Sequence, residues 1–202
     1  MRRHWFDMTF RSATGGMAAT DWRTRDIVVT AIIGVVFGVV MAVWNVLWGG
    51  LDGVFAIWPP AKDVLYGVWL MPAVLAPLIV RKAGAGLFAE LVAAALSTFL
   101  GSQFGPDALI SGLVQGGAAE LVFLVLRYRV WVFPVAVVAG VASAAAAWIH
   151  DWILWYPDAA LDVQLLRGLM MGISGVVVVA IGSWLLVRAL RQAGVLQGFP
   201  AG

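Results

Sequence analysis

Six long apolar stretches alternate with short polar loops along this chain. A helix needs about 20 apolar residues to cross roughly 30 Å of hydrocarbon. The stretches are continuous rather than alternately polar and apolar, which favours helices over the strands of a membrane barrel. The pattern therefore predicts an all-α membrane protein, a bundle of six transmembrane helices. The predicted spans are residues 27–48, 64–80, 83–100, 108–126, 130–156 and 165–187.

This pattern divides the chain into three regions. Residues 1–25 are polar, mixed in charge and lack the apolar core of a signal peptide, so we expect a flexible cytoplasmic tail. Residues 26–191 form the predicted transmembrane domain, and residues 192–202 a short cytoplasmic C-terminal tail. Pro72 and Pro77 predict a bend in the second span, because proline removes a helical hydrogen bond.

Positive charge is unevenly distributed between the two sides of the predicted bundle. One side holds eleven of the thirteen Lys and Arg residues, in the tails and in the loops after the second and fourth spans. The other side has only Lys62 and Arg167, among five aspartates, and we expect Arg167 to neutralise Asp151 or Asp162. The positive-inside rule predicts that both termini are cytoplasmic, in a multi-pass protein of the cell membrane.

Composition narrows the function. The chain is 62% hydrophobic and 12% charged, with a mean hydropathy of +0.94, so its surface must face lipid. Its basic loops suit anionic headgroups and do not require nucleic acid as a partner. The absence of cysteine excludes thiol chemistry, and no phosphate loop, HExxH motif or Ser–His pairing is present. We therefore expect no enzyme activity, no cofactor and no metal site.

Three acids lie inside predicted spans: Glu90, Glu120 and Asp151. Glu90 and Glu120 are at similar depth in the third and fourth spans, and a charge there costs about 2.5–3.5 kcal/mol unless it faces protein or water. They could contact a ligand, share a proton or hold helices together. Gln115 shares a helical face with Gly112 and Ala119, whereas Glu120 is about 140° away from Gln115 on a regular helix. The acids also permit an alternative function, a proton-coupled secondary transporter of a small organic cation.

Aromatic residues cluster near the outer ends of the spans. Trp148 and Asp151 share one face of the fifth span with further tryptophans, and Tyr66 and Trp69 share a face of the second. A carboxylate framed by indole rings suits an organic cation. An interfacial tryptophan belt would give the same pattern, and His150 could simply be a hydrogen-bonded residue at the interface.

Small residues follow one face of the first span, at Gly34, Gly38 and Ala42. Such a stripe lets another helix approach closely. It predicts either packing within the bundle or docking to a partner subunit.

Several motifs resemble the YkoE family, over roughly residues 25–200. They are YGVW at 66–69, RKAGA at 81–85 followed by Glu90, and above all GLVQGGAAELVF at 112–123. The family comprises substrate-binding S components of energy-coupling factor (ECF) transporters, linked to uptake of thiamine or hydroxymethylpyrimidine. The resemblance implies six helices, a pocket open to the outside and a lid from the loop at 49–63. It also implies partners, a transmembrane coupling subunit and ATPase subunits.

The residues and the resemblance together predict a subunit that captures thiamine or its hydroxymethylpyrimidine precursor outside the cell. We expect Glu90, Gln115 and Glu120 to supply polar contacts and Asp151 to offset positive charge. The aromatic rings that would stack on the ligand or close the site are those of Tyr66, Trp69, Trp148 and His150.

Overall fold

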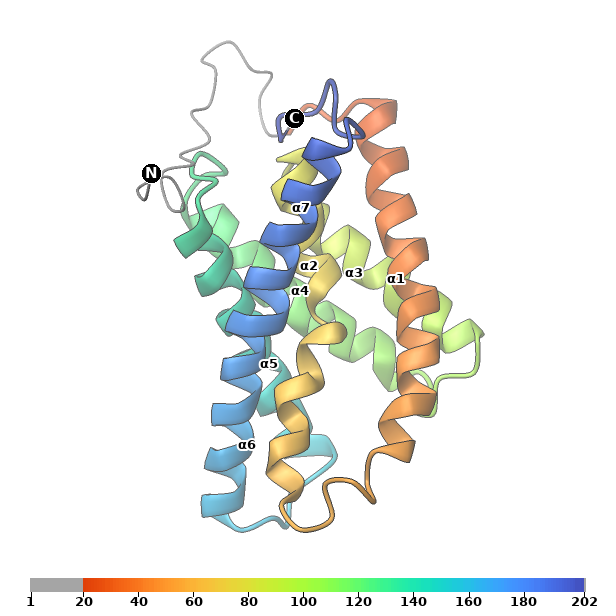
Figure 1. The fold of residues 1–202 in the computed structure, drawn as a ribbon, viewed down its shortest axis with the longest axis vertical. Helices are drawn as coiled ribbons and strands as arrows, with labels where there is room; N and C mark the ends of the chain where they lie inside the picture. The colour runs from red at the N-terminus through yellow and green to blue at the C-terminus, as the bar shows by residue number, and fades with distance from the viewer. Residues whose placement is uncertain (1–19, 202) are drawn as a thin grey trace.

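The computed structural model describes residues 20–201, which are all-helical apart from turns and loops. Residues 1–19 of the predicted tail lie outside the described residues. Figure 1 shows the helices, which in chain order are α1 (Thr24–Gly50), η1 (Pro59–Val68), α2 (Met71–Val80), α3 (Ala85–Phe99), α4 (Asp107–Val125), α5 (Phe133–Leu154), α6 (Leu161–Ser174), η2 (Gly175–Ile181) and α7 (Gly182–Gln192).

These elements form six spans within the described residues. Helices α1, α4 and α5 are each one span, η1 and α2 join into a second (Pro59–Val80), and α6, η2 and α7 join into the last (Leu161–Gln192). All five are long and apolar enough to cross a membrane, and α3 is a shorter apolar helix. The six-helix prediction fits this architecture. Helices α3 and α4 slant across the bundle behind α1 and α2 (Figure 1).

The second span is central and broken. Every residue from Pro72 to Val80 is buried, which makes α2 the core around which other spans pack. The break lies at Trp69 and Leu70, between the 3₁₀ segment η1 and α2. The predicted bend is thus displaced toward the N-terminus, because Pro72 fits the first turn of α2, where no partner for its nitrogen is needed. The α-helix continues through Pro77.

The sixth span carries a π-helical segment, η2, where it contacts α5 and η1. A Cβ atom on Gly140 would lie only 2.3 Å from the carbonyl oxygen of Gly175, so α5 and η2 touch backbone to backbone. Close by, the backbone N–H of Gly67 donates to Ser174 Oγ at 2.7 Å. The irregular segments of the second and sixth spans, η1 and η2, therefore contact each other at the same depth in the bundle.

The small-residue stripe of α1 packs inside the protein. Cβ atoms on Gly34 and Gly38 would lie 2.6 Å and 2.7 Å from the Cβ atoms of Val92 and Leu96 on α3. Both glycines are buried, and Ala42 is partly buried. Of the two predicted roles, the described structure supports packing against α3.

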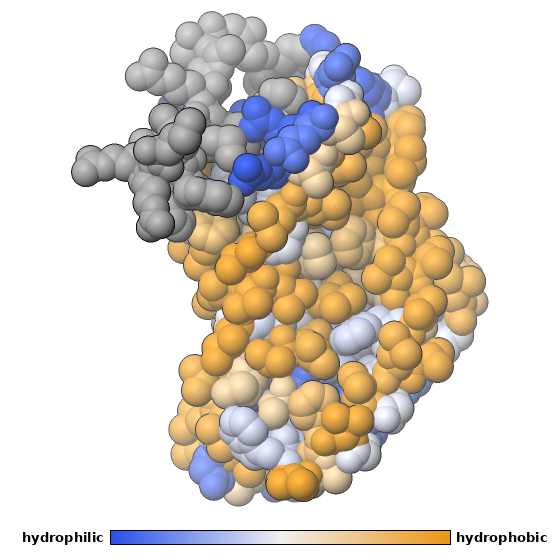
Figure 2. Space-filling view, in the orientation of Figure 1, coloured by the Kyte–Doolittle hydropathy of each residue, from blue (hydrophilic) through white to orange (hydrophobic). Residues whose placement is uncertain are grey.

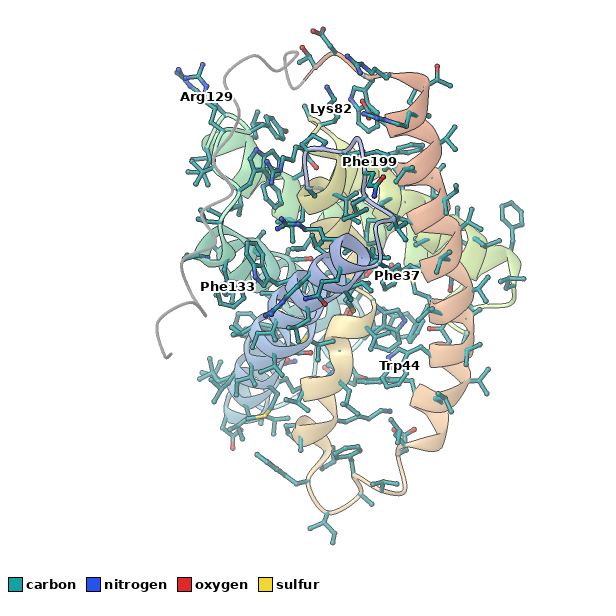
Figure 3. The ribbon with its side chains drawn as sticks, turned by 45° about the horizontal axis from the view of Figure 1, so that its top comes forward. Phe37, Trp44, Lys82, Arg129, Phe133 and Phe199 are labelled. Atoms are coloured by element: carbon teal, nitrogen blue, oxygen red, sulfur yellow. The ribbon has the colours of Figure 1, made fainter. Side chains whose placement is uncertain are left out.

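The surface divides into an apolar belt and a basic end. Apolar residues cover most of the face in Figure 2, and hydrophilic residues gather near the end of α7. At this end Lys82 Nζ lies 3.9 Å from Asp26 Oδ2, and the guanidinium of Arg25 lies 4.4 Å from the ring centroid of Phe199. Figure 3 shows Lys82 and Phe199 together there. The segment 193–201 folds in turns onto this end and buries Leu196.

Candidate functional site

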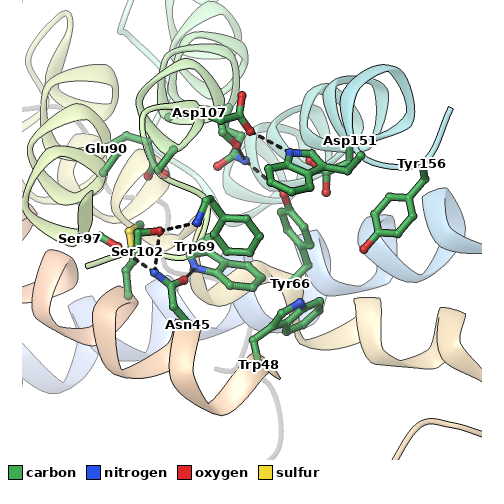
Figure 4. A pocket seen from close by; sticks show the side chains of 18 of the residues that line it. Asn45, Trp48, Tyr66, Trp69, Glu90, Ser97, Ser102, Asp107, Asp151 and Tyr156 are labelled. Atoms are coloured by element: carbon green, nitrogen blue, oxygen red, sulfur yellow. Dashed lines mark hydrogen bonds between the residues drawn. The ribbon is translucent and has the colours of Figure 1, made fainter. Parts of the chain in front are cut away.

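A cavity lies between the spans, toward the end opposite to the basic loops. Figure 4 shows it from close by. It occupies about 690 Å³ including its mouth, and its walls come from α1, the second span, α3, α4, α5 and α6. In α1, α4, α5 and α6 the lining residues lie toward the same end of the bundle, away from the basic turns, whereas Glu90 of α3 lies deeper.

An aromatic wall surrounds Trp69, which follows η1. The ring centroids of Trp48, Tyr66 and Phe104 lie 4.7, 5.0 and 5.9 Å from that of Trp69, all in edge-to-face geometry. Such pairs contribute about 0.5–1.5 kcal/mol each beyond buried area. The break after η1 lets Trp69 point toward α1 and the α3–α4 loop. The result is a rigid apolar surface on which a flat ring can stack.

Asn45 of α1 fixes the orientation of Trp69. Its side-chain oxygen accepts the indole N–H of Trp69 at 2.9 Å. Its amide nitrogen donates to Ser97 Oγ at 3.0 Å and to Ser102 Oγ at 3.1 Å. One buried amide therefore ties together α1, the second span, α3 and the α3–α4 loop.

Glu90 lies on the cavity wall contributed by α3 and is almost fully buried. One carboxylate oxygen accepts the backbone N–H of Ala73 at 3.1 Å. Ala73 is in the first turn of α2, whose amides have no partner within the helix because the span is broken just before it. The break thus provides a helix N-terminus inside the bundle, and the Glu90 side chain gives one of its free amides a hydrogen-bond acceptor.

Two further carboxylates line the outer part of the cavity. Asp107 at the start of α4 accepts the indole N–H of Trp155 at 2.8 Å. His150 of α5 places its two ring nitrogens 3.2 Å from Asp107 Oδ1 and 3.2 Å from Asp151 Oδ1. Asp107 and Asp151 both face the cavity, whereas His150 lies behind them.

Arg167 supplies positive charge on α6. Its Nε lies 2.9 Å from Asp63 Oδ2 of η1, and its guanidinium lies 3.4 Å from the ring centroid of Tyr156. The partner predicted for Arg167 was Asp151 or Asp162, which is wrong for this structure. The backbone approach of Gly67 to Ser174 brings η1 against α6, and this contact makes Asp63 the near carboxylate.

Five of the eight residues predicted to bind the ligand line this one cavity. They are Tyr66, Trp69, Glu90, Gln115 and Asp151. The amide nitrogen of Gln115 donates to Ser111 Oγ and lies 3.4 Å from the phenol oxygen of Tyr66. The geometry therefore assembles residues from four spans around one space, and their contact with a ligand stays a prediction.

Glu120 does not line the cavity. Its carboxylate accepts the backbone N–H groups of Gly84 at 2.6 Å and Gly86 at 2.9 Å, at the N-terminus of α3. It also accepts the phenol of Tyr128 at 2.7 Å. Burial, together with the Glu120 carboxylate, raises the pKa of Tyr128 well above its usual value, so the phenol remains a donor. These contacts support a role for Glu120 in holding the basic end together.

Trp148 and His150 are also off the cavity wall. Trp148 donates its indole N–H to the backbone oxygen of Gln164 at 2.9 Å. Its ring packs so closely on Gly168 that a Cβ atom there would lie 2.8 Å away. The face shared by Trp148 and Asp151 in a helical wheel therefore divides between the α5–α6 contact and the cavity.

The cavity also contains residues that the sequence analysis did not select. Asn45 was detectable, because Thr30 and Asn45 are the only polar side chains other than tryptophan in the first predicted span. Asp107 carried a weaker signal, as an acid at the start of the fourth span. Ser97 carried a signal too, because helical spacing places it on one face with Glu90 and Ala94. Phe104 and Tyr156 carried no distinct signal, since residues of their kind are common near span ends.

Comparisons with known proteins agree with this architecture. Residues 25–146 match the family described as "ABC-type cobalt transport system, permease component". The chain is 32% identical over 183 residues to a protein of Bacillus subtilis (strain 168) that bears the name HMP/thiamine permease protein YkoE, where HMP is hydroxymethylpyrimidine. That similarity spans 90% of this chain and 91% of the relative. Among residues 20–201, no three His, Cys, Asp or Glu side chains are grouped as a metal site would require.

A solved structure has the same fold. It is described as the crystal structure of an S-component of an ECF transporter, with a TM-score of 0.83 and 32% identity, covering 89% of this chain and 90% of the other. Six spans around a cavity, with this likeness, define a multi-pass membrane transporter component rather than an enzyme. The chain belongs to the YkoE family of ECF transporter S components.

Proposed function

We propose that this S component captures thiamine or its hydroxymethylpyrimidine precursor at the outer face of the cell membrane. The observation that carries the proposal is one cavity that combines a wall of aromatic rings in edge-to-face contact with three acidic side chains. It lies at the end of the bundle opposite to the basic loops, which the positive-inside rule assigns to the cytoplasm. The name of the Bacillus subtilis relative points to the same ligands.

The cavity suits the chemistry of an aminopyrimidine. Its flat ring would stack in the aromatic wall around Trp69, and its amine and ring nitrogens need acceptors and donors such as Glu90 and Gln115. Thiamine adds a cationic thiazolium ring, which Asp107 and Asp151 would stabilise. Glu120, Trp148 and His150 would act behind the cavity wall and not touch the ligand.

Transport would require other subunits. The sequence has no phosphate loop for ATP hydrolysis, so we propose that an ECF coupling subunit and ATPase subunits drive release to the cytoplasm. The loop between α1 and η1 is the proposed lid. Lys62, near the start of η1, bonds Asp52 of that loop and lies 4.2 Å from the ring centroid of Trp48 on the cavity wall.

Calorimetric titration of the detergent-purified chain tests the ligand assignment. We expect thiamine or hydroxymethylpyrimidine to bind more tightly than about micromolar, and thiamine phosphate more weakly, because Asp107 and Asp151 repel its phosphate. Failure of all three compounds to bind would overturn the proposal.

The variant Asp151→Asn sharpens this test. Losing one carboxylate beside a bound cation should weaken thiamine binding by about tenfold, or about 1.4 kcal/mol. The matched control is Asp158→Asn in the exposed loop before α6, which should leave the affinity unchanged. Equal affinities in both variants would remove Asp151 from the proposed site.

A secondary transporter receives less support from the structure. Glu90 and Glu120 accept hydrogen bonds from the first turns of different helices, α2 and α3. Among residues 20–201 no hydrogen bond joins the two carboxylates. Reconstitution into liposomes would decide, because uptake driven by a proton gradient without ATPase subunits would favour that alternative.

A further inference from the structure

The carboxylates on the outer cavity wall are bridged from behind by one imidazole. His150 is buried, and its Nε2 and Nδ1 atoms each lie 3.2 Å from a carboxylate oxygen, of Asp107 on α4 and of Asp151 on its own helix α5. Both aspartates line the cavity and His150 does not. The ring thus holds two ligand-facing acids in place without facing the ligand itself.

Hydrogen-bond chemistry sets the charge of this bridge. A neutral imidazole has one N–H donor and one acceptor nitrogen, whereas an imidazolium has two donors. Carboxylates only accept, so His150 satisfies both aspartates only when both ring nitrogens carry protons. The cluster Asp107–His150–Asp151 then has a net charge of −1. The proton on His150 is the one that this cluster can release.

Neighbouring elements contribute the other charged and titratable groups around this cluster. From α3 comes Glu90, and from η1 come Tyr66 and Asp63. From α6 comes Arg167, which lines the cavity but is paired with Asp63 at 2.9 Å. A cation placed beside Asp107 and Asp151 would therefore compete first with the proton on His150 for the same two carboxylates.

We propose that His150 is a positioning residue that exchanges its proton for the charge of a cationic ligand. This inference rests on the proposed function and adds to it a way in which the site distinguishes a cationic ligand from a neutral one. Binding of a cation between the two aspartates expels a proton from the ring to water, so the charge of the site is conserved. Affinity for thiamine then rises with pH as His150 loses its proton in the free protein, and affinity for a neutral pyrimidine lacks this dependence.

Calorimetry in buffers of different ionisation enthalpy counts the protons released. Thiamine and hydroxymethylpyrimidine share the aminopyrimidine ring, so any proton taken up by that ring cancels when the two ligands are compared. We expect thiamine to release up to about one proton more than hydroxymethylpyrimidine, and His150→Gln to abolish the difference. Equal release by the two ligands in the unaltered protein would overturn the inference while leaving the proposed function intact.

A spectroscopic measurement keeps the test independent of that variant. The chain has two histidines, His4 and His150, so His4→Gln leaves one imidazole for ¹⁵N magnetic resonance in detergent. We expect two protonated ring nitrogens without ligand and one after saturation with thiamine. A ring that is neutral without ligand, or protonated in both states, would overturn the exchange. Absence of binding by both ligands would overturn the proposed function and this inference with it.

Discussion

Asn45 shows how one amide in an apolar helix shapes a binding cavity. Among residues 20–201 it is the α1 side chain that bonds Trp69, Ser97 and Ser102, which belong to three other parts of the chain. Its amide uses both its acceptor and its donors, so the geometry of the ring wall depends on this one residue. A buried donor left without a partner costs about 1–3 kcal/mol.

Replacing Asn45 should therefore disturb the ligand site more than the fold. In Asn45→Leu the indole N–H of Trp69 loses its acceptor, and we expect thiamine affinity to fall by about 10-fold, from a loss of about 1–2 kcal/mol. Binding is measured by calorimetry and the ring environment by tryptophan fluorescence. Val46→Leu on the lipid-facing side of α1, 78% exposed, is the matched control and should change neither. Unaltered affinity in Asn45→Leu would show that the hydrogen bond from Trp69 to Asn45 is not required for ligand binding.

At the scale of elements, both intramembrane acids stabilise helix N-termini. Glu90 accepts from the first turn of α2, which exists because the second span is broken. Glu120 accepts from the first turn of α3 and holds it against α4. Each acid thus meets a positive helix end, an arrangement that stabilises a carboxylate. They differ in that Glu90 also faces the cavity.

Neutral variants should separate these two roles. Glu120→Gln replaces charge-assisted bonds at Gly84 and Gly86 by weaker ones, so we expect a lower melting temperature in detergent, from a loss of about 1–3 kcal/mol. Thiamine affinity should stay unchanged. Glu90→Gln, the matched comparison, should lower both stability and affinity. A large affinity loss in Glu120→Gln alone would return Glu120 to the list of ligand contacts.

Helix contacts through glycine give a second prediction at this scale. A methyl group in Gly140→Ala would meet the backbone oxygen of Gly175 at 2.3 Å, and backbone cannot move aside as a flexible side chain can. We expect a loss of at least about 1–3 kcal/mol, seen as a lower melting temperature. Gly117→Ala on α4 is the control, because nothing lies within 4 Å of its added atom. That change should be neutral or stabilising by about 0.5–1 kcal/mol. Equal melting temperatures in the two variants would contradict the close α5–η2 contact.

At the scale of the whole molecule, the sequence predicted the spans well and the cavity partly. The first span was expected at 27–48 and is Thr24–Gly50, because lipid demands continuous apolarity that is visible locally. The irregularity of the second span was predicted as a bend at Pro72 and Pro77, but the break lies at Trp69 and Leu70. The π-helical η2 was missed, since it depends on contacts with other helices. The partner of Arg167 was also missed, because Asp63 is 104 residues away along the chain and only the packing of η1 on α6 brings them together.

The orientation of the bundle in the membrane is a prediction, and it decides whether the cavity opens to the outside or to the cytoplasm. The turns after α2 and α4 and the end of α7 lie at one end of the bundle and carry the basic residues, and the cavity lies at the other. With the basic end in the cytoplasm, the α1–η1 loop and the cavity face outward. Capture of a vitamin from outside the cell requires this orientation.

Cysteine labelling can test that orientation, because the chain has no cysteine of its own. Ile57 in the α1–η1 loop is 99% exposed and Val195 after α7 is 62% exposed, so either position can accept a thiol. In intact cells, a membrane-impermeant maleimide should label Ile57→Cys and leave Val195→Cys unlabelled. After permeabilisation both variants should react, which controls for expression and access. The reverse pattern in intact cells would turn the cavity toward the cytoplasm, and capture from outside would then be untenable.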